Sequence, residues 1–214
     1  MRSPAVCLLA LAAAACSSPS APPDPCTVGV LGDATQSIVL QAIALDPNMT
    51  PFTVASGDSV TLAFPPQGGR VIFAGVRATN LDGCGVQVEG VIRDLTTHQV
   101  RLDSRTVNLS PTGDGWGESD PTDVSTFANV PVCPNEWSAT NLYGTPYQLE
   151  LAVTDRGGRT ATQTLQVTPE CSEPAHAAEC LCICKGGYVL GEVCADTSDG
   201  GADAGDEGGG DGGT

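Results

Sequence analysis

Apolar and polar residues alternate along most of this chain, and that alternation is the pattern of strands with one buried face. The clearest run is YQLELAVTD, in which the apolar face is formed by Tyr147, Leu149, Leu151 and Val153. After the turn residues 155–158, the run RTATQTLQVTP continues with apolar residues against a threonine face. The two runs and the turn between them predict a β-hairpin over 146–169.

Further strands are predicted wherever the alternation recurs between turn-rich stretches such as DPNMTP, PPQGG and NLDG. They are 37–45, 52–55, 59–64, 70–79, the run from Val86 to Arg93 and the run from Val100 to Asp103. Helical periodicity is scarcely visible. Many short strands with turns between them indicate an all-β fold, and we expect an antiparallel sandwich over 27–169 rather than a βαβ fold.

The predicted terminal hairpin, with its turn DRGGRT, resembles the last two strands of bacterial immunoglobulin-like domains. The resemblance covers 146–169 and implies an immunoglobulin-like sandwich.

The stretch 110–134 breaks the alternation, and its glycines, acids and prolines predict a long surface loop. This loop carries Trp116, which is a candidate binding residue because an exposed indole can stack on a sugar ring. The alternative is that Trp116 folds back over the edge of the sandwich. The acids of the loop lack the fixed ligand spacing of known calcium sites. These acids are Asp114, Glu118, Asp120 and Asp123.

The first 16 residues have the parts of a secretory leader: Arg2, an apolar run that is too short to span a membrane, and small residues before Cys16. The run Ala-Ala-Ala-Cys at 13–16 resembles the lipobox of bacterial lipoproteins. This resemblance implies a signal peptide over 1–15, a lipid on Cys16 and attachment to a membrane. Ser17 favours the outer membrane. The alternative is cleavage after an alanine, which would give a soluble secreted protein.

Two segments flank the predicted sandwich without the composition to fold. The Ser- and Pro-rich stretch 16–26 predicts a tether. The acidic, glycine-rich stretch 195–214 cannot bury enough apolar area to fold and predicts a disordered tail. The short leader, the tether and the tail together resemble surface lipoproteins of myxobacteria.

The chain has 25 acidic and 9 basic residues, so we expect no binding of nucleic acid or of anionic lipid headgroups through charge. We find none of the familiar catalytic motifs and expect no metal, no cofactor and no enzymatic activity. The sequence therefore favours a structural or binding module for a protein or an envelope glycan. The competing hypothesis is a glycan hydrolase of the envelope with its site in 110–134.

Eight further cysteines follow the predicted lipidation site. They are Cys26, Cys84, Cys133, Cys171, Cys180, Cys182, Cys184 and Cys194. Their even number and the predicted export favour disulfides. The C-x-C-x-C spacing at 180–184 differs from the C-x2-C pairs that are usual for zinc.

The segment 170–194 is predicted to be a hairpin appendage that disulfides hold to the sandwich. If 179–185 is a strand, its three cysteines share a face, and each needs a partner elsewhere. A three-residue turn at Gly186 pairs Cys194 with Cys180, which we favour, whereas a two-residue turn places Cys194 across from Glu179. Cys171, Cys182 and Cys184 would then pair with Cys26, Cys84 and Cys133. A bond between Cys84 and Cys133 is the alternative.

Overall fold

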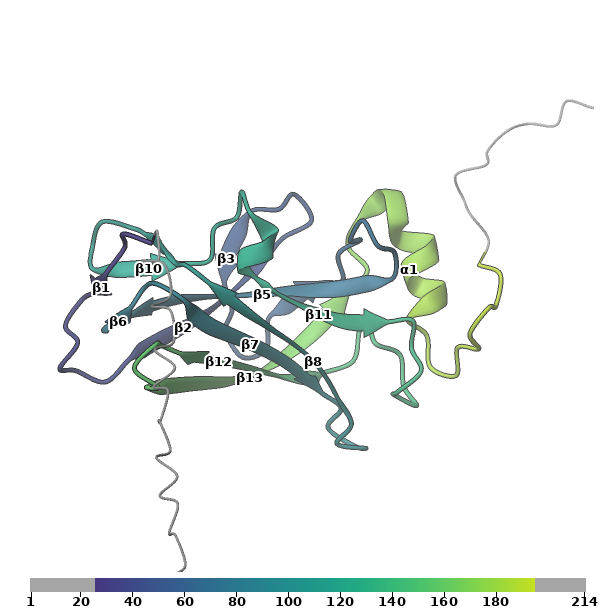
Figure 1. The fold of residues 1–214 in the computed structure, drawn as a ribbon. Helices are drawn as coiled ribbons and strands as arrows, with labels where there is room; N and C mark the ends of the chain where they lie inside the picture. The colour runs from purple at the N-terminus through teal and green to yellow at the C-terminus, as the bar shows by residue number, and fades with distance from the viewer. Residues whose placement is uncertain (1–25, 195–214) are drawn as a thin grey trace, which may run out of the picture.

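The computed structural model describes residues 26–194. The expected signal peptide (1–15), nearly all of the expected tether (16–26) and the expected acidic tail (195–214) lie outside the described residues, and so does the lipidation predicted at Cys16. Within the described range the protein consists of two packed β-sheets, a two-stranded ribbon and a short helical segment (Figure 1).

The first sheet has the strand order β3-β2-β5-β10-β9, and β11 also pairs with β5. Its strands are β3 (Pro51–Thr53), β2 (Val39–Leu45), β5 (Arg70–Thr79), β10 (Trp116–Glu118), β9 (Ser110–Pro111) and β11 (Ala128–Cys133). The second sheet has the order β4-β13-β12-β7-β8. Its strands are β4 (Ser59–Thr61), β13 (Thr160–Glu170), β12 (Tyr147–Thr154), β7 (Val86–Arg93) and β8 (Val100–Val107). The ribbon pairs β1 (Val30–Leu31) with β6 (Leu81–Asp82). The expected all-β sandwich is confirmed, although β4 and β13 run parallel.

Alternating burial along the strands produces the core between the sheets. On β12 every second residue from Tyr147 is buried, and the residues between them are half-exposed. On β5 nearly every residue is buried because both of its faces are covered. One face joins the main core, and Phe73 on the other face lies in a second apolar cluster with Phe127. Gly75 is needed beneath this cluster, because a Cβ there would lie 2.4 Å from the Phe127 ring.

The hairpin predicted over 146–169 is confirmed as β12 and β13, which pair antiparallel from Tyr147 and Val167 to Thr154 and Thr160. Asp155 at the turn is buried, and its carboxylate accepts hydrogen bonds from the backbone N–H and the guanidinium of Arg159. Because the chain must reverse sharply here, Gly158 adopts φ +76°, in the left-handed region that glycine tolerates best.

The long surface loop predicted over 110–134 is a wrong prediction. This stretch contains β9, β10, the short 3-10 helix η1 (Val124–Thr126) and β11. Ala128, Val130 and Val132 do alternate toward the core, but the run is short and Pro131 interrupts it. The pairing of β11 with β5 is irregular between Pro131 and Cys133.

The hairpin predicted over 170–194 is also wrong. After η2 (Pro174–His176), the cysteine-rich stretch forms the helix α1 (Ala177–Ile183) rather than a strand. Cysteines at every second position also fit a helix, because positions four apart share one helix face. Cys180 and Cys184 accordingly point into the core, while Cys182 is only half-buried.

The last strand of the second sheet, β8, carries charges on the side that faces β11. The carboxylate of Asp103 accepts a hydrogen bond of 2.8 Å from the backbone N–H of Asn129 on β11. Arg105 pairs with the same carboxylate, and the guanidinium of Arg101 lies 5.8 Å from the ring centre of Trp137. Side chains rather than backbone pairing therefore connect β8 to β11.

The two ends of the described chain lie at opposite ends of the sandwich. Cys26 is bonded to Cys84, close to the β1–β6 ribbon, whereas α1 and the residues after it lie at the other end (Figure 1). β5 spans this distance, with Thr79 at the ribbon end and Arg70 at the helix end.

Candidate functional site

All eight cysteines predicted to form disulfides are paired. The bonds are Cys26–Cys84, Cys133–Cys184, Cys171–Cys180 and Cys182–Cys194. The favoured pairing of Cys180 with Cys194 is wrong, and so is the alternative bond between Cys84 and Cys133. Of the three disulfides expected between the appendage and the sandwich, only one is formed, and it joins Cys184 to Cys133.

The helix explains why the predicted connectivity fails. The prediction placed Cys180, Cys182 and Cys184 on one face of a strand, whereas α1 turns Cys182 away from the other two. Cys182 therefore meets the returning chain at Cys194, and Cys180 meets Cys171, which directly follows β13.

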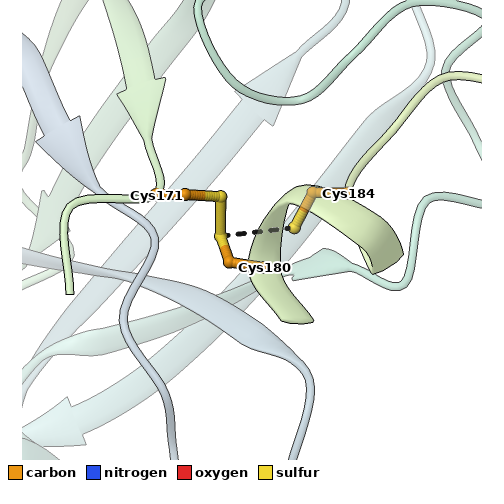
Figure 2. Close-up of side chains that lie close together, drawn as sticks. All are labelled: Cys171, Cys180 and Cys184. Carbon is orange, nitrogen blue, oxygen red and sulfur yellow. Dashed lines mark hydrogen bonds between the residues drawn. A yellow bond between two sulfur atoms is a disulfide. The ribbon is translucent and has the colours of Figure 1, made fainter. Parts of the chain in front are cut away.

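Two of these disulfides lie next to each other beneath α1. The Sγ atoms of Cys180 and Cys184 are 3.9 Å apart, although each is bonded to a different partner (Figure 2). Cys171, Cys180 and Cys184 are the one set of three potential metal ligands in residues 26–194 whose ligand atoms lie within 4.8 Å of one another. All three sulfurs are already in disulfides, so in this state none offers the thiolate that a metal ion needs.

Arg70 fixes the start of α1 to the sandwich. Its side chain is fully buried, donates from Nη2 to the carbonyl of His176 at 3.0 Å and forms an ion pair with Glu179 at 2.8 Å. Its Nη1 donates to the carbonyl of Gly69, and the guanidinium lies 4.9 Å from the ring centre of Phe64. The sequence gives no signal that Arg70 anchors a helix, because it is simply the first residue of the strand predicted over 70–79.

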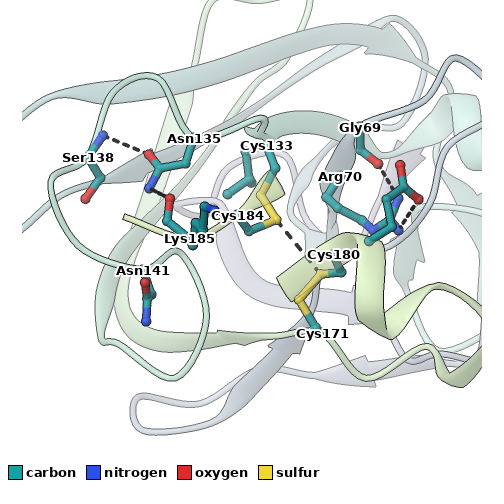
Figure 3. The surroundings of a disulfide bond; sticks show 12 residues. Gly69, Arg70, Cys133, Asn135, Ser138, Asn141, Cys171, Cys180, Cys184 and Lys185 are labelled. Carbon is teal, nitrogen blue, oxygen red and sulfur yellow. Dashed lines mark hydrogen bonds and ion pairs between the residues drawn. A yellow bond between two sulfur atoms is a disulfide. The ribbon is translucent and has the colours of Figure 1, made fainter. Parts of the chain in front are cut away.

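The end of α1 is held by the segment that follows β11. The backbone N–H of Asn135 donates to the carbonyl of Ile183 at 2.8 Å, and its Nδ2 donates to the carbonyl of Lys185 at 2.9 Å (Figure 3). The backbone N–H of Gly186 donates to Oδ1 of Asn141. The helix is therefore attached at both ends to the sandwich, and the Cys133–Cys184 bond belongs to the attachment at its C-terminal end.

Trp116, the candidate binding residue, lies on β10 rather than on an exposed loop. It is half-buried, and the guanidinium of Arg77 lies 4.7 Å from its ring centre. Arg77 also forms an ion pair with Asp114 at 2.6 Å. An arginine therefore lies over the indole ring and occupies one face of it.

The acids near Trp116 are engaged by neighbouring residues rather than gathered around a common point. The hydroxyl of Thr112, the backbone N–H of Trp116 and the charge of Arg77 hold the pKa of Asp114 below its usual value. Asp123 accepts from the backbone N–H of Ser125 and so caps η1. Calcium binding at these acids receives no support from this arrangement.

Asp120 and Asp123 line a hollow of about 350 Å³ between residues 106–108 and the stretch 110–134, where the hydrolase hypothesis places its site. The hydroxyl and backbone N–H of Thr122 lower the pKa of Asp120. A general acid of a glycoside hydrolase needs a raised pKa, so Asp120 does not suit that role.

The most exposed large aliphatic side chains of the described range lie in the loop that the Cys182–Cys194 bond closes. We call residues 185–193 the C-terminal ring. Its Val189, Leu190 and Val193 are 67%, 69% and 91% exposed. Lys185 and Glu192 form an ion pair across it. The hairpin predicted over 170–194 gave no indication of this exposed ring.

Comparison with known proteins adds no relative: no protein-family model matches the chain, and no curated protein is significantly similar to it. None of the helices among residues 26–194 is long and apolar enough to cross a membrane.

Proposed function

We propose that this protein is an exported lipoprotein of the bacterial outer membrane that acts as a binding or structural module at the cell surface. The observation that carries the proposal is the pairing of all eight cysteines after position 16 into four disulfides. Disulfides of this number persist in oxidising compartments, which agrees with the leader and lipobox at the start of the chain.

The positions of the two chain ends favour a particular orientation. A lipid on Cys16 would be ten residues before Cys26, at the ribbon end of the sandwich. α1 and the C-terminal ring would then point away from the membrane (Figure 1). Trp116 pairs with Thr79 at the ribbon end and would face the membrane instead.

The C-terminal ring is the surface we assign to the partner. Aliphatic side chains held in the open by a disulfide give up little conformational entropy on binding, and their burial stabilises a complex. An aliphatic surface suits a protein partner better than a glycan, because sugars are recognised by aromatic stacking and hydrogen bonds.

The intact mass of the mature protein from its host tests the anchor. The expected species starts at Cys16, carries a lipid and lacks the eight hydrogens that four disulfides remove. The control is Cys16→Ser, which should lose the lipid and leave the membrane fraction. A wild-type protein that begins within the alanine run without lipid would refute the anchor and favour secretion.

Photo-crosslinking in intact cells tests the binding surface. A photoreactive residue replaces Leu190 in one full-length variant, and replaces the exposed but polar Thr162 on β13 in the other. We expect a discrete adduct of constant mass at 190 and none at 162. Equal adducts at both positions, or none at 190, would refute the assignment of the ring.

A further inference from the structure

Four sulfur atoms form a continuous row beneath α1. The order is Cys171, Cys180, Cys184 and Cys133: the first two and the last two are bonded, and the gap between them is 3.9 Å (Figure 3). A disulfide is broken by a thiolate that attacks one of its sulfurs, so a thiolate formed at Cys180 would already be beside the next disulfide.

Access to this row is uneven. Cys171 is half-buried, whereas Cys180, Cys184 and Cys133 are 2%, 0% and 7% exposed. Cys171 follows the end of β13 and precedes an exposed serine, and it is the most exposed residue of the row, so we take it as the point at which a thiol from solvent attacks. Attack at Cys171 makes Cys180 the leaving group.

We propose that these two disulfides act as a relay, in which a thiol that attacks the accessible Cys171 breaks the buried Cys133–Cys184 bond. The attacking thiolate forms a mixed disulfide with Cys171 and releases Cys180 as a thiolate. Cys180 attacks Sγ of Cys184, the Cys180–Cys184 disulfide forms, and Cys133 leaves as a thiolate that takes a proton from water. When the attacking reagent is a dithiol, its second thiol then attacks the mixed disulfide. This step frees Cys171 as a thiol and leaves the reagent as a cyclic disulfide.

The electrons balance with one dithiol. Two electrons pass from the dithiol to the protein, which loses one disulfide in total and gains thiols at Cys171 and Cys133. The second step is an exchange without net oxidation or reduction. The outcome differs from direct reduction, which would leave both thiols on the two cysteines of a single original bond.

The end of α1 can accommodate the new bond. Cys184 is the residue at which the helix ends, with φ −100° and ψ 1°, and its backbone N–H donates to the carbonyl of Cys180 at 3.0 Å. Residues four apart on a helix have Cα atoms about 6 Å apart, within the range that a disulfide spans, but their Cβ atoms are about 5–6 Å apart, whereas a disulfide needs about 4 Å. The backbone of the last turn must therefore rearrange so that the two Cβ atoms approach each other.

The exchange would remove the disulfide that links α1 to β11. Cys133 belongs to β11, and its bond to Cys184 is the covalent link between that strand and the helical segment. After exchange, the new bond lies within the helical segment itself. The Arg70–Glu179 ion pair and the contacts of Asn135 then hold α1 against the sandwich without a disulfide.

Mapping of the first two thiols tests the relay. The mature full-length protein carries Cys182→Ser and Cys194→Ser, so that the third disulfide of this region does not consume reagent. It receives one equivalent of dithiothreitol without oxygen, is quenched with acid, alkylated, and mapped by peptide mass spectrometry. We expect alkylation at Cys171 and Cys133 and a Cys180–Cys184 crosslink. Alkylation at Cys171 and Cys180, with Cys133–Cys184 intact, would overturn the relay.

A matched variant checks the entry point. In the same background, Cys171→Ser with Cys180→Ser removes the attacking sulfur and leaves the Cys133–Cys184 bond in place. Alkylation of Cys133 should become slower by about ten-fold or more, because the reagent must then reach a buried bond directly. An unchanged rate would show that Cys133 is released without passing through Cys180.

Discussion

The Cys133–Cys184 bond should contribute more to the free energy of unfolding than either of the other two disulfides of the C-terminal segment. Its sequence separation is 51 residues, and the loop-closure relation gives about 4 kcal/mol for a loop of this length. Replacing both residues by alanine also removes two well-buried sulfurs, and the resulting void adds about 1 kcal/mol. We expect a loss of about 5 kcal/mol in the free energy of unfolding.

The matched control replaces Cys182 and Cys194 by alanine. Their separation is 12 residues, for which the same relation gives about 3 kcal/mol, and both are only half-buried, so little void forms. Guanidinium titrations followed by circular dichroism measure both double variants. Equal losses in the two variants, or a larger loss in the control, would refute the argument from loop length and burial.

Three further changes have defined outcomes. Gly75→Ala should destabilise the protein by about 1–3 kcal/mol in thermal unfolding, because its Cβ meets the Phe127 ring, whereas Gly68→Ala has open space and only its φ of +86° to oppose it. Burial raises the pKa of Asp155, but the N–H and guanidinium of Arg159 lower it more, so the net pKa is depressed. The carboxylate therefore stabilises the fold above its unfolded pKa, and this contribution disappears as the pH falls through the folded pKa; Asp155→Asn should lose less stability than the wild type between about pH 5 and about pH 2. Dithiothreitol should make residues after Pro169 sensitive to protease before the sandwich melts, and unchanged sensitivity after full reduction would contradict this.

The strands that the sequence predicts well are those with turn residues at both ends or with uninterrupted alternation. β5 begins and ends where expected because Gly68 and Gly69 precede it and Asn80 follows it with a positive φ. β12 and β13 are equally clear, since their alternation is uninterrupted. β11 is hidden by contrast, because Pro131 lies inside it and acidic and glycine-rich residues precede it.

The candidate site is less predictable because it depends on contacts between distant residues. The run CLCIC fits a strand and a helix equally well, and the choice between them decides which cysteines face inward. That disulfides would form followed from the even number of cysteines and from the leader, but eight cysteines allow 105 pairings. The anchoring role of Arg70 depends on Glu179, which is 109 residues away and has no local signature.

The charges on the inner side of β8 have a consequence for self-association. An uncovered strand at the end of a sheet is a template for a strand from another molecule, and such pairing begins aggregation. An incoming strand here would have to displace the Asp103 carboxylate from Asn129 and Arg105, and would bury the guanidinium groups of Arg101 and Arg105 away from their present contacts. Copies of the protein should therefore remain separate at this edge, even at high concentration.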